Sequence, residues 1–290
     1  MARKIPTLPN LLIIGASKAG TTSLHDYLSR HPEIHMSENK ELAFFDPRLR
    51  WNLGVDWYKA NFDAAYRING ESSPQYTTYP IVPDVPRRIK EVLGAPKFIY
   101  LLRDPVDRLL SQYTQVLDDF PGARSFSEIL PNIENEDAGY IQKSSYFLQL
   151  NEYLQLFPRD SILVVINERL AARPRETLRA VFRFIGVDET FWSAELEAYR
   201  NVGGEKRQTA AWFDNHAPSF LKTYLRSEPT VLPWKVKEAV RSVSRLGGTV
   251  TRKPKLASQD DLRLQQLLRA DVTALRHFLG DPLPEWRPYA

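Results

Sequence analysis

LLIIGASKAGTTSLHDYL, residues 11–28, is the stretch that decides the fold. An apolar run is followed by a short loop from Gly15 to Gly20 and then by a helical pattern. A strand, a tight glycine-containing turn and a helix point backbone N–H groups at one spot, where the helix dipole favours an anion. The stretch therefore predicts an anion-binding loop at the end of a buried strand.

The position of the lysine distinguishes this loop from that of nucleotide hydrolases. A nucleotide-hydrolysing P-loop reads G-x-x-x-x-G-K-[ST], but Thr21 stands at the lysine position and Lys18 lies inside the loop. A carboxylate for Mg²⁺ is also missing where a strand ends, because the KFIYLL run leads first into Arg103. Both features argue against Mg-nucleotide hydrolysis, although a P-loop kinase or NTPase remains the alternative.

The composition of the 290 residues excludes several kinds of site. The chain has no cysteine, which excludes disulfides, thiolate metal ligands and a cysteine nucleophile. The net charge of +4 favours anionic ligands without indicating nucleic acid as a partner. The apolar run 11–14 is too short for a signal peptide, and no stretch approaches the roughly 20 apolar residues that span a bilayer. We therefore expect no transmembrane segment, and nothing in the sequence sets an oligomeric state.

Short apolar runs alternate with helical patterns along most of the chain. We expect strands at 11–15, 34–36, 66–69, 97–102 and 161–166. We expect helices at about 22–30, 55–62, 85–92, 106–117, 146–157, 174–185 and 259–279. The runs KFIYLL and SILVVI are almost wholly apolar, as in parallel strands that are buried on both faces. The pattern predicts an α/β, P-loop-like three-layer fold with a central, mostly parallel sheet flanked by helices, and ligands at the carboxyl ends of its strands.

After about residue 200 the alternation of apolar runs and helical patterns ends, and the sequence becomes more basic. Residues 222–255 carry nine Lys or Arg and two Glu, with helical pieces between prolines. We expect a single domain over 1–290 with a basic helical elaboration at about 200–256. A non-catalytic module that binds a polyanion through this basic segment is a second alternative.

A second motif is YLLRDPVDRLLSQY, residues 100–113. The strand delivers Arg103 at its carboxyl end, Pro105 begins a helix, and Ser111 lies two turns into it. The guanidinium fork of an arginine suits a phosphate group. Alternatively, Asp104 and Asp107 cap the helix and pair locally with Arg103 or with the neighbouring Arg108.

A third motif is HPEIHMSENKELAFFD, residues 31–46. Lys40 and Glu41 lie just before the aromatic pair Phe44-Phe45. A carboxylate close to apolar rings loses solvation, which raises its pKa towards a value useful for a general base. The alternative is an ordinary surface Lys-Glu pair at the start of a helix.

In order and spacing, GASKAGTTSL, NKELAFFD, GVDWY, GESSPQY and LLRDPVDRLLSQY resemble the PAPS-dependent sulfotransferase family. PAPS is 3′-phosphoadenosine 5′-phosphosulfate. The resemblance runs from about residue 9 to residue 190 and is greatest to the heparan sulfate sulfotransferase-like branch and its bacterial relatives. It implies transfer of a sulfuryl group to a hydroxyl or amine of a carbohydrate, glycolipid or small metabolite, with 3′,5′-ADP as product and no metal. Because the Golgi enzymes of this branch carry a membrane anchor that we do not expect here, we predict a cytoplasmic, bacterial enzyme.

The resemblance also assigns roles to residues. Glu41 corresponds to the base that deprotonates the acceptor, and Lys18 contacts the bridging oxygen as charge develops there. Arg103 and Ser111 correspond to the 3′-phosphate site. The residues that correspond to the 5′-phosphosulfate loop are Ser17, Lys18, Ala19, Gly20, Thr21, Thr22 and Ser23.

Other positions depart from the family's pattern or leave two interpretations open. The family's E-K-S-P motif reads Glu71-Ser72-Ser73-Pro74, so Ser72 replaces its lysine, and Lys40 is a candidate to compensate. Lys206 and Arg207 lie where the family has a basic loop over the cofactor, and either contact a phosphate or lie in a solvated loop. A histidine base is the alternative to Glu41, with His25, His31 and His35 nearest the motifs. Tyr146 either lines the acceptor cleft or belongs to the core.

Overall fold

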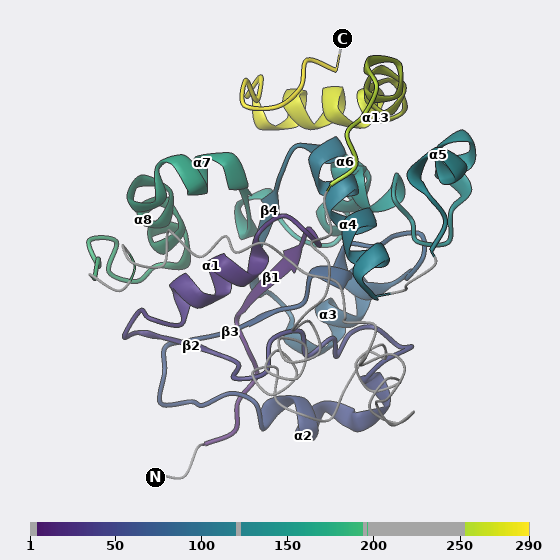
Figure 1. The fold of residues 1–290 in the computed structure, drawn as a ribbon. Helices are drawn as coiled ribbons and strands as arrows, with labels where there is room; N and C mark the ends of the chain where they lie inside the picture. Colours follow the sequence, from purple (N-terminus) through teal and green to yellow (C-terminus); the bar gives the residue numbers. More distant parts are fainter. Residues whose placement is uncertain (1–4, 120–122, 194–195, 197–252, 290) are drawn as a thin grey trace, which may run out of the picture.

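The computed structural model describes residues 5–119, 123–193, 196 and 253–289 (Figure 1). Its centre is a parallel sheet in the order β2-β3-β1-β4-β5. The strands are β1 Leu11–Gly15, β2 Ile34–Met36, β3 Ile68–Ser72, β4 Lys97–Leu102 and β5 Ile162–Ile166. Leu12 of β1 lies opposite Glu71 of β3 and Phe98 of β4. The predicted α/β fold with a central parallel sheet is confirmed.

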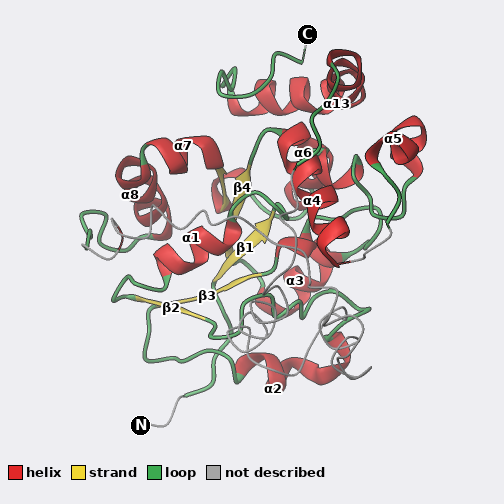
Figure 2. Cartoon of the chain, in the orientation of Figure 1, coloured by secondary structure: helices red, strands yellow, loops and turns green. Residues whose placement is uncertain are grey.

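Helices cover both faces of this sheet (Figure 2). The α-helices are α1 Thr21–Leu28, α2 Gly54–Lys59, α3 Val85–Leu93, α4 Pro105–Asp119, α5 Phe126–Ile129, α6 Tyr146–Leu154, α7 Asn167–Ala172, α8 Pro174–Ile185 and α13 Ser258–Leu279. Short 3₁₀ helices span Trp51–Leu53, Pro74–Tyr76, Leu130–Asn135, Gln142–Ser144 and Arg159–Ser161. Right-handed crossovers put α1 on one face and α3, α4 and α6 on the other, so α1 and α4 approach the carboxyl end of β1 from opposite sides.

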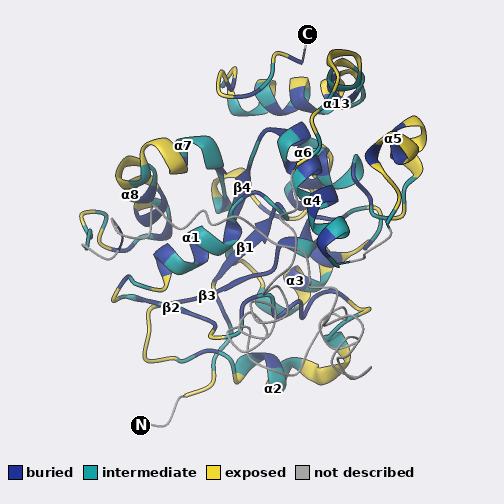
Figure 3. Cartoon of the chain, in the orientation of Figure 1, coloured by how far each residue is buried: buried dark blue, intermediate teal, exposed yellow. Residues whose placement is uncertain are grey.

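The core lies along β1 and β4, whose apolar side chains are buried (Figure 3). The expected strand at 66–69 is displaced, because β3 is Ile68–Ser72 and contains Gly70-Glu71-Ser72. Polar residues in a central strand conceal it from a hydrophobicity pattern. They are tolerated in β3 because hydroxyl partners satisfy the buried Glu71.

The described C-terminal part packs against the β4–α4 turn. Helix α13 lies on α6 and α4 (Figure 1). The tail after it reaches the start of α4, where the Tyr289 hydroxyl accepts the N–H of Val106 at 3.3 Å. The Arg287 guanidinium donates to Asp104 at 2.5 Å and to Asp261 at 2.9 Å. The tail therefore buttresses the segment that carries Arg103. Most of the basic segment 222–255 lies outside the described residues.

Candidate active site

The loop that is predicted to bind an anion follows β1 as expected. Gly20 caps the N-terminus of α1 with φ of 97°, and Lys18 also has a positive φ, of 70°. A Cβ atom on Gly20 would come within 2.5 Å of Asn167 Oδ1 at the start of α7. Glycine is therefore required there both by backbone conformation and by the close approach of a neighbouring side chain.

The first turn of α1 is open to an anion. No side chain caps this described helix, and its first turn carries no acidic residue. The N–H groups at its start have no partner within the helix. Thr22 and Ser23 are partly exposed, whereas Thr21 is buried. In the loop, Ser17 is partly exposed and Ala19 is buried, so Ala19 has only backbone groups to offer.

One face of α4 connects the loop with the second motif. The Lys18 ammonium donates to Gln115 Oε1 at 2.8 Å. At the other end, Nη2 of Arg103 lies 3.7 Å from Asp107 Oδ2. Asp107, Ser111 and Gln115 are spaced four residues apart, which puts them on the same face of the helix. The structure thus brings Lys18, Ser111 and Arg103 together along about 12 Å of helix.

Around Arg103 the structure shows the helix cap and the local ion pair that were the alternative to a phosphate site. Asp104 Oδ1 accepts a hydrogen bond from the N–H of Asp107 at 3.0 Å, so Asp104 does cap α4. Burial raises the pKa of Asp107, but the charges of Lys253, Arg287 and Arg103 outweigh it and lower that pKa. Arg103 is therefore paired with the Asp107 carboxylate, and 29% of the Arg103 side-chain surface stays exposed to solvent.

Tyr146 and Arg108 are both buried beside the predicted site. Tyr146 is fully buried, and its hydroxyl donates to the carbonyl of Arg103 at 2.8 Å. It is a core residue that fixes Arg103 and does not line a cleft. Arg108 does not pair with an aspartate. Buried, it donates to Ser144 Oγ at 2.8 Å and to the Ser17 carbonyl at 3.5 Å.

Sequence reasoning missed Arg108, Gln115 and Asn167, which all contact the anion-binding loop or its lysine. Spacing could have indicated one of them, because Gln115 lies four residues after Ser111 on the expected helix. Asn167 follows β5 directly, at the carboxyl edge where ligands were expected.

Glu41 lies in an irregular segment between β2 and the 3₁₀ helix Trp51–Leu53, not at a helix start. Lys40 Nζ is 2.7 Å from Glu41 Oε1, and the Glu41 N–H donates to the carbonyl of Ser72 at 2.9 Å. This bond places Glu41 beside the carboxyl end of β3. The Glu41 side chain is 36% exposed, so the neighbouring Phe44 and Phe45 do not enclose its carboxylate. Both rings point into the core.

Ser72, which replaces the family's lysine, is fully buried. Within the described residues its hydroxyl has no hydrogen-bond partner. The buried cation beside this position is Lys40, whose side chain is 4% exposed. Compensation by Lys40 for the missing lysine stays a prediction.

The three histidines near the motifs are either buried or placed against backbone carbonyl groups. Burial and the charge of Lys40 lower the pKa of His25 to about 4, so its 6%-exposed ring is neutral at physiological pH. Nε2 of His31 lies 3.1 Å from the carbonyl of Asp188, and Nε2 of His35 lies 3.2 Å from that of Asn61. The Glu41 side chain, which is 36% exposed, is more accessible to solvent than the His25 ring.

Other expectations concern the basic loop, metal binding and membrane spans. Lys206 and Arg207 lie outside the described residues. Within the described ranges, no cluster of three or more His, Asp or Glu side chains is placed to hold a metal ion, and no helix is long and apolar enough to cross a membrane.

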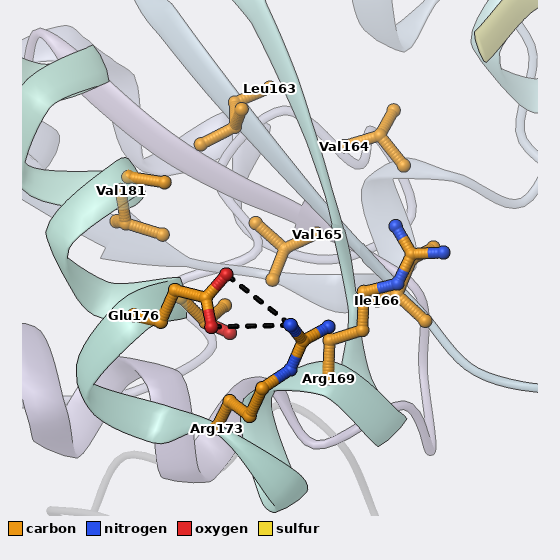
Figure 4. A pocket seen from close by; sticks show the side chains of 10 residues that line it. Leu163, Val164, Val165, Ile166, Arg169, Arg173, Glu176 and Val181 are labelled. Atoms are coloured by element: carbon orange, nitrogen blue, oxygen red, sulfur yellow. Dashed lines mark hydrogen bonds and ion pairs between the residues drawn. The ribbon is translucent and has the colours of Figure 1, made fainter. Parts of the chain in front are cut away.

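A cavity of about 210 Å³ lies between β5, α7 and α8 and contains none of the expected site residues (Figure 4). Its exposed polar pair is Arg173 and Glu176.

Comparison with known proteins agrees with the motifs. The family model described as "Sulfotransferase domain" matches residues 8–201. Human heparan sulfate glucosamine 3-O-sulfotransferase 5 is 30% identical over 193 residues, which cover 63% of this chain and 55% of that protein. Mouse heparan sulfate glucosamine 3-O-sulfotransferase 3B1 is 33% identical over 189 residues, covering 62% and 46%. The chain thus spans about half the length of these relatives.

Solved structures share the fold. A sulfotransferase from Alicyclobacillus acidocaldarius matches with a TM-score of 0.64 at 23% identity, over 96% of this chain and 98% of that one. Mouse sulfotransferase SULT7A1, solved with PAP, matches with a TM-score of 0.52 at 14% identity, over 93% and 89%. Because the family model covers most of the chain, the protein belongs to the sulfotransferase domain family.

Proposed function

We propose that this protein transfers the sulfuryl group of PAPS to a hydroxyl or amine of an acceptor, with Glu41 as the general base. The observation that carries the proposal is the shared face of α4, which links Lys18 through Gln115 to Arg103 through Asp107. A nucleotide with phosphates at both its 5′ and 3′ ends needs two separated cationic positions on one surface. A P-loop kinase has no use for the second position.

The fit of the residues to PAPS supports the proposal. The open N-terminus of α1 and Lys18 suit the 5′-phosphosulfate, and Arg103 with Ser111 suits the 3′-phosphate. The related mouse SULT7A1 was solved with PAP, the product that PAPS leaves behind. Metal ligands are not needed in this scheme.

The proposed reaction is an in-line displacement. The acceptor oxygen or nitrogen bonds to sulfur while the bond between sulfur and the bridging oxygen breaks. Glu41 takes the acceptor proton, and the leaving nucleotide keeps the electron pair as negative charge next to Lys18. Backbone N–H groups of the loop stabilise this charge because they are oriented before the reaction begins. Lys40 holds Glu41 through its 2.7 Å ion pair and supplies the positive charge that Ser72 lacks.

The acceptor class we propose is a carbohydrate. The names of the two curated relatives describe sulfation of a glucosamine hydroxyl in heparan sulfate. The test is transfer of radiolabelled sulfate from PAPS to a desulfated glycosaminoglycan, a glycolipid and a phenol, with ATP and Mg²⁺ as a parallel donor. Labelling of the glycosaminoglycan is expected. Labelling of only the phenol would refute the acceptor class, and phosphate transfer from ATP would refute the reaction. The single-domain organisation and the cytoplasmic location stay predictions.

Replacement of Gly20 by alanine should weaken binding of PAP and lower the melting temperature. The positive φ costs an alanine about 1–3 kcal/mol, and its Cβ would displace Asn167 from the loop. Gly280→Ala is the matched control, because Gly280 is also left-handed, with φ of 62°, but a Cβ atom there would meet no atom within 4 Å. Calorimetric titration with PAP should show lost affinity in Gly20→Ala alone. Equal affinities in the two variants would show that the loop does not bind the nucleotide.

A further inference from the structure

Behind the loop that carries Glu41 lies a fully buried carboxylate, Glu71 of β3. Its Oε1 accepts hydrogen bonds from the hydroxyls of Tyr58 at 2.5 Å and Tyr76 at 2.9 Å, and its Oε2 accepts one from Ser73 at 2.8 Å. Burial raises the pKa of the Glu71 carboxyl, and the hydrogen bonds from Tyr58, Ser73 and Tyr76 oppose this rise. In its ionised form the carboxylate has acceptors and no donor. The hydroxyl protons of all three partners therefore point at Glu71.

Two of these hydroxyls use their remaining lone pairs to hold the loop. Ser73 Oγ accepts the backbone N–H of Ala43 at 2.9 Å, and the Tyr76 hydroxyl accepts that of Phe45 at 3.3 Å. The N–H of Glu41 is bonded to the end of β3. Alternating amides of residues 41–45 are thus all held by the segment 72–76, and Glu71 decides which way two of the three acceptors face.

The loop needs such support because its backbone is unfavourable. Glu41 has φ of 63° and Ala43 has φ of 52°, and neither is a glycine. A left-handed backbone is unfavourable for a residue that has a side chain, and it persists only where the surroundings hold it. Without the bonds to Ala43 and Phe45, the chain around Glu41 would relax towards ordinary conformations and move the carboxylate.

We propose that Ser73 and Tyr76, whose hydroxyls Glu71 orients, are positioning residues that hold the Glu41 carboxylate in its reactive place. This inference rests on the proposed function, in which Glu41 is the base. Glu71 itself is fully buried and touches no substrate. Its role is to orient two hydroxyls so that they accept, and do not donate, towards the loop.

The test compares variants that remove a loop contact with one that does not. Ser73→Ala and Tyr76→Phe each remove an acceptor for a loop amide. Tyr58→Phe is the matched control: it also deprives Glu71 of a hydrogen bond, but its ring still stacks on Phe44 with centroids 4.4 Å apart. Within the described structure the Tyr58 hydroxyl bonds to Glu71 and to no amide of residues 41–45.

We expect kcat for labelled sulfate transfer to fall about 10- to 100-fold in Ser73→Ala and Tyr76→Phe, with KM for PAPS and affinity for PAP unchanged. Tyr58→Phe should stay within about twofold of the wild-type kcat, whatever its melting temperature. Hydrogen exchange supplies a readout that needs no activity: the amides of Ala43 and Phe45 should exchange faster in the first two variants and not in the third.

Two results would overturn the inference: an equal loss of kcat in Tyr58→Phe, or normal kcat and amide exchange in both Ser73→Ala and Tyr76→Phe. These failures differ from a failure of the proposed function. Full activity in Glu41→Gln, or the absence of any transfer by the wild type, would refute Glu41 as the base or the reaction. Faster amide exchange confined to Ser73→Ala and Tyr76→Phe would still support the loop-holding role of the network.

Discussion

Glu41→Gln is expected to lower kcat for sulfate transfer by about 10²–10⁴, the range that a general base contributes. The amide keeps the size of the side chain but cannot take the acceptor proton. Because Glu41 is not among the residues proposed to hold the nucleotide, affinity for PAP should be unchanged. Initial rates with radiolabelled PAPS and calorimetric titration with PAP measure the two quantities.

Glu91→Gln is the matched control for this substitution. Glu91 lies on α3, half-exposed, in an ion pair with Arg87. Its replacement should leave both kcat and PAP affinity at wild-type values. If Glu41→Gln turned over as fast as Glu91→Gln, the base would have to be another group.

Lys18→Met should reduce kcat by about 10²–10³, as the loss of one electrostatic contact to the developing negative charge does in other enzymes. Lys18 is also proposed to bind the 5′ end of the nucleotide, so PAP affinity should weaken as well. Single-turnover transfer from enzyme-bound PAPS separates the chemical step from the loss of binding. We expect single-turnover transfer to be slower in Lys18→Met than in the wild type.

The control for Lys18→Met is Lys90→Met, which removes one positive charge from an exposed position on α3. It distinguishes a local contact from an effect of net charge on a cationic protein. A slower chemical step in both variants to the same extent would contradict the role of Lys18.

The backbone of the site was predictable because it depends on local pattern. An apolar strand, a glycine-containing turn and a helical pattern identified β1, the loop and α1. The same reasoning placed Arg103 at the end of β4 and Ser111 on α4. Each of these features needs only the periodicity of a strand or helix and the rule that ligands gather at the carboxyl ends of parallel strands.

The environment of the catalytic groups could not be predicted, because it depends on contacts between distant segments. Glu41 was expected against aromatic rings, but those rings turn into the core and Lys40 holds its carboxylate. Tyr146 reaches the Arg103 carbonyl from 43 residues away. Glu71 lies in β3, a strand whose polar residues do not give the hydrophobic pattern expected of a central strand. Its three hydroxyl partners come from residues 58, 73 and 76, and only the folded structure shows that they meet at one carboxylate.

The central claim is that the two ends of one nucleotide are bound along α4, and calorimetric titration with PAP and with AMP tests it most directly. The two ligands differ only by the 3′-phosphate, which Arg103 and Ser111 are proposed to bind. We expect the wild type to bind PAP about 10- to 100-fold more tightly than AMP, since a hydrogen bond to a charged group contributes about 1.5–3 kcal/mol. In Arg103→Ala this preference should largely disappear while AMP affinity is retained. Equal affinities of the wild type for PAP and AMP would contradict the account.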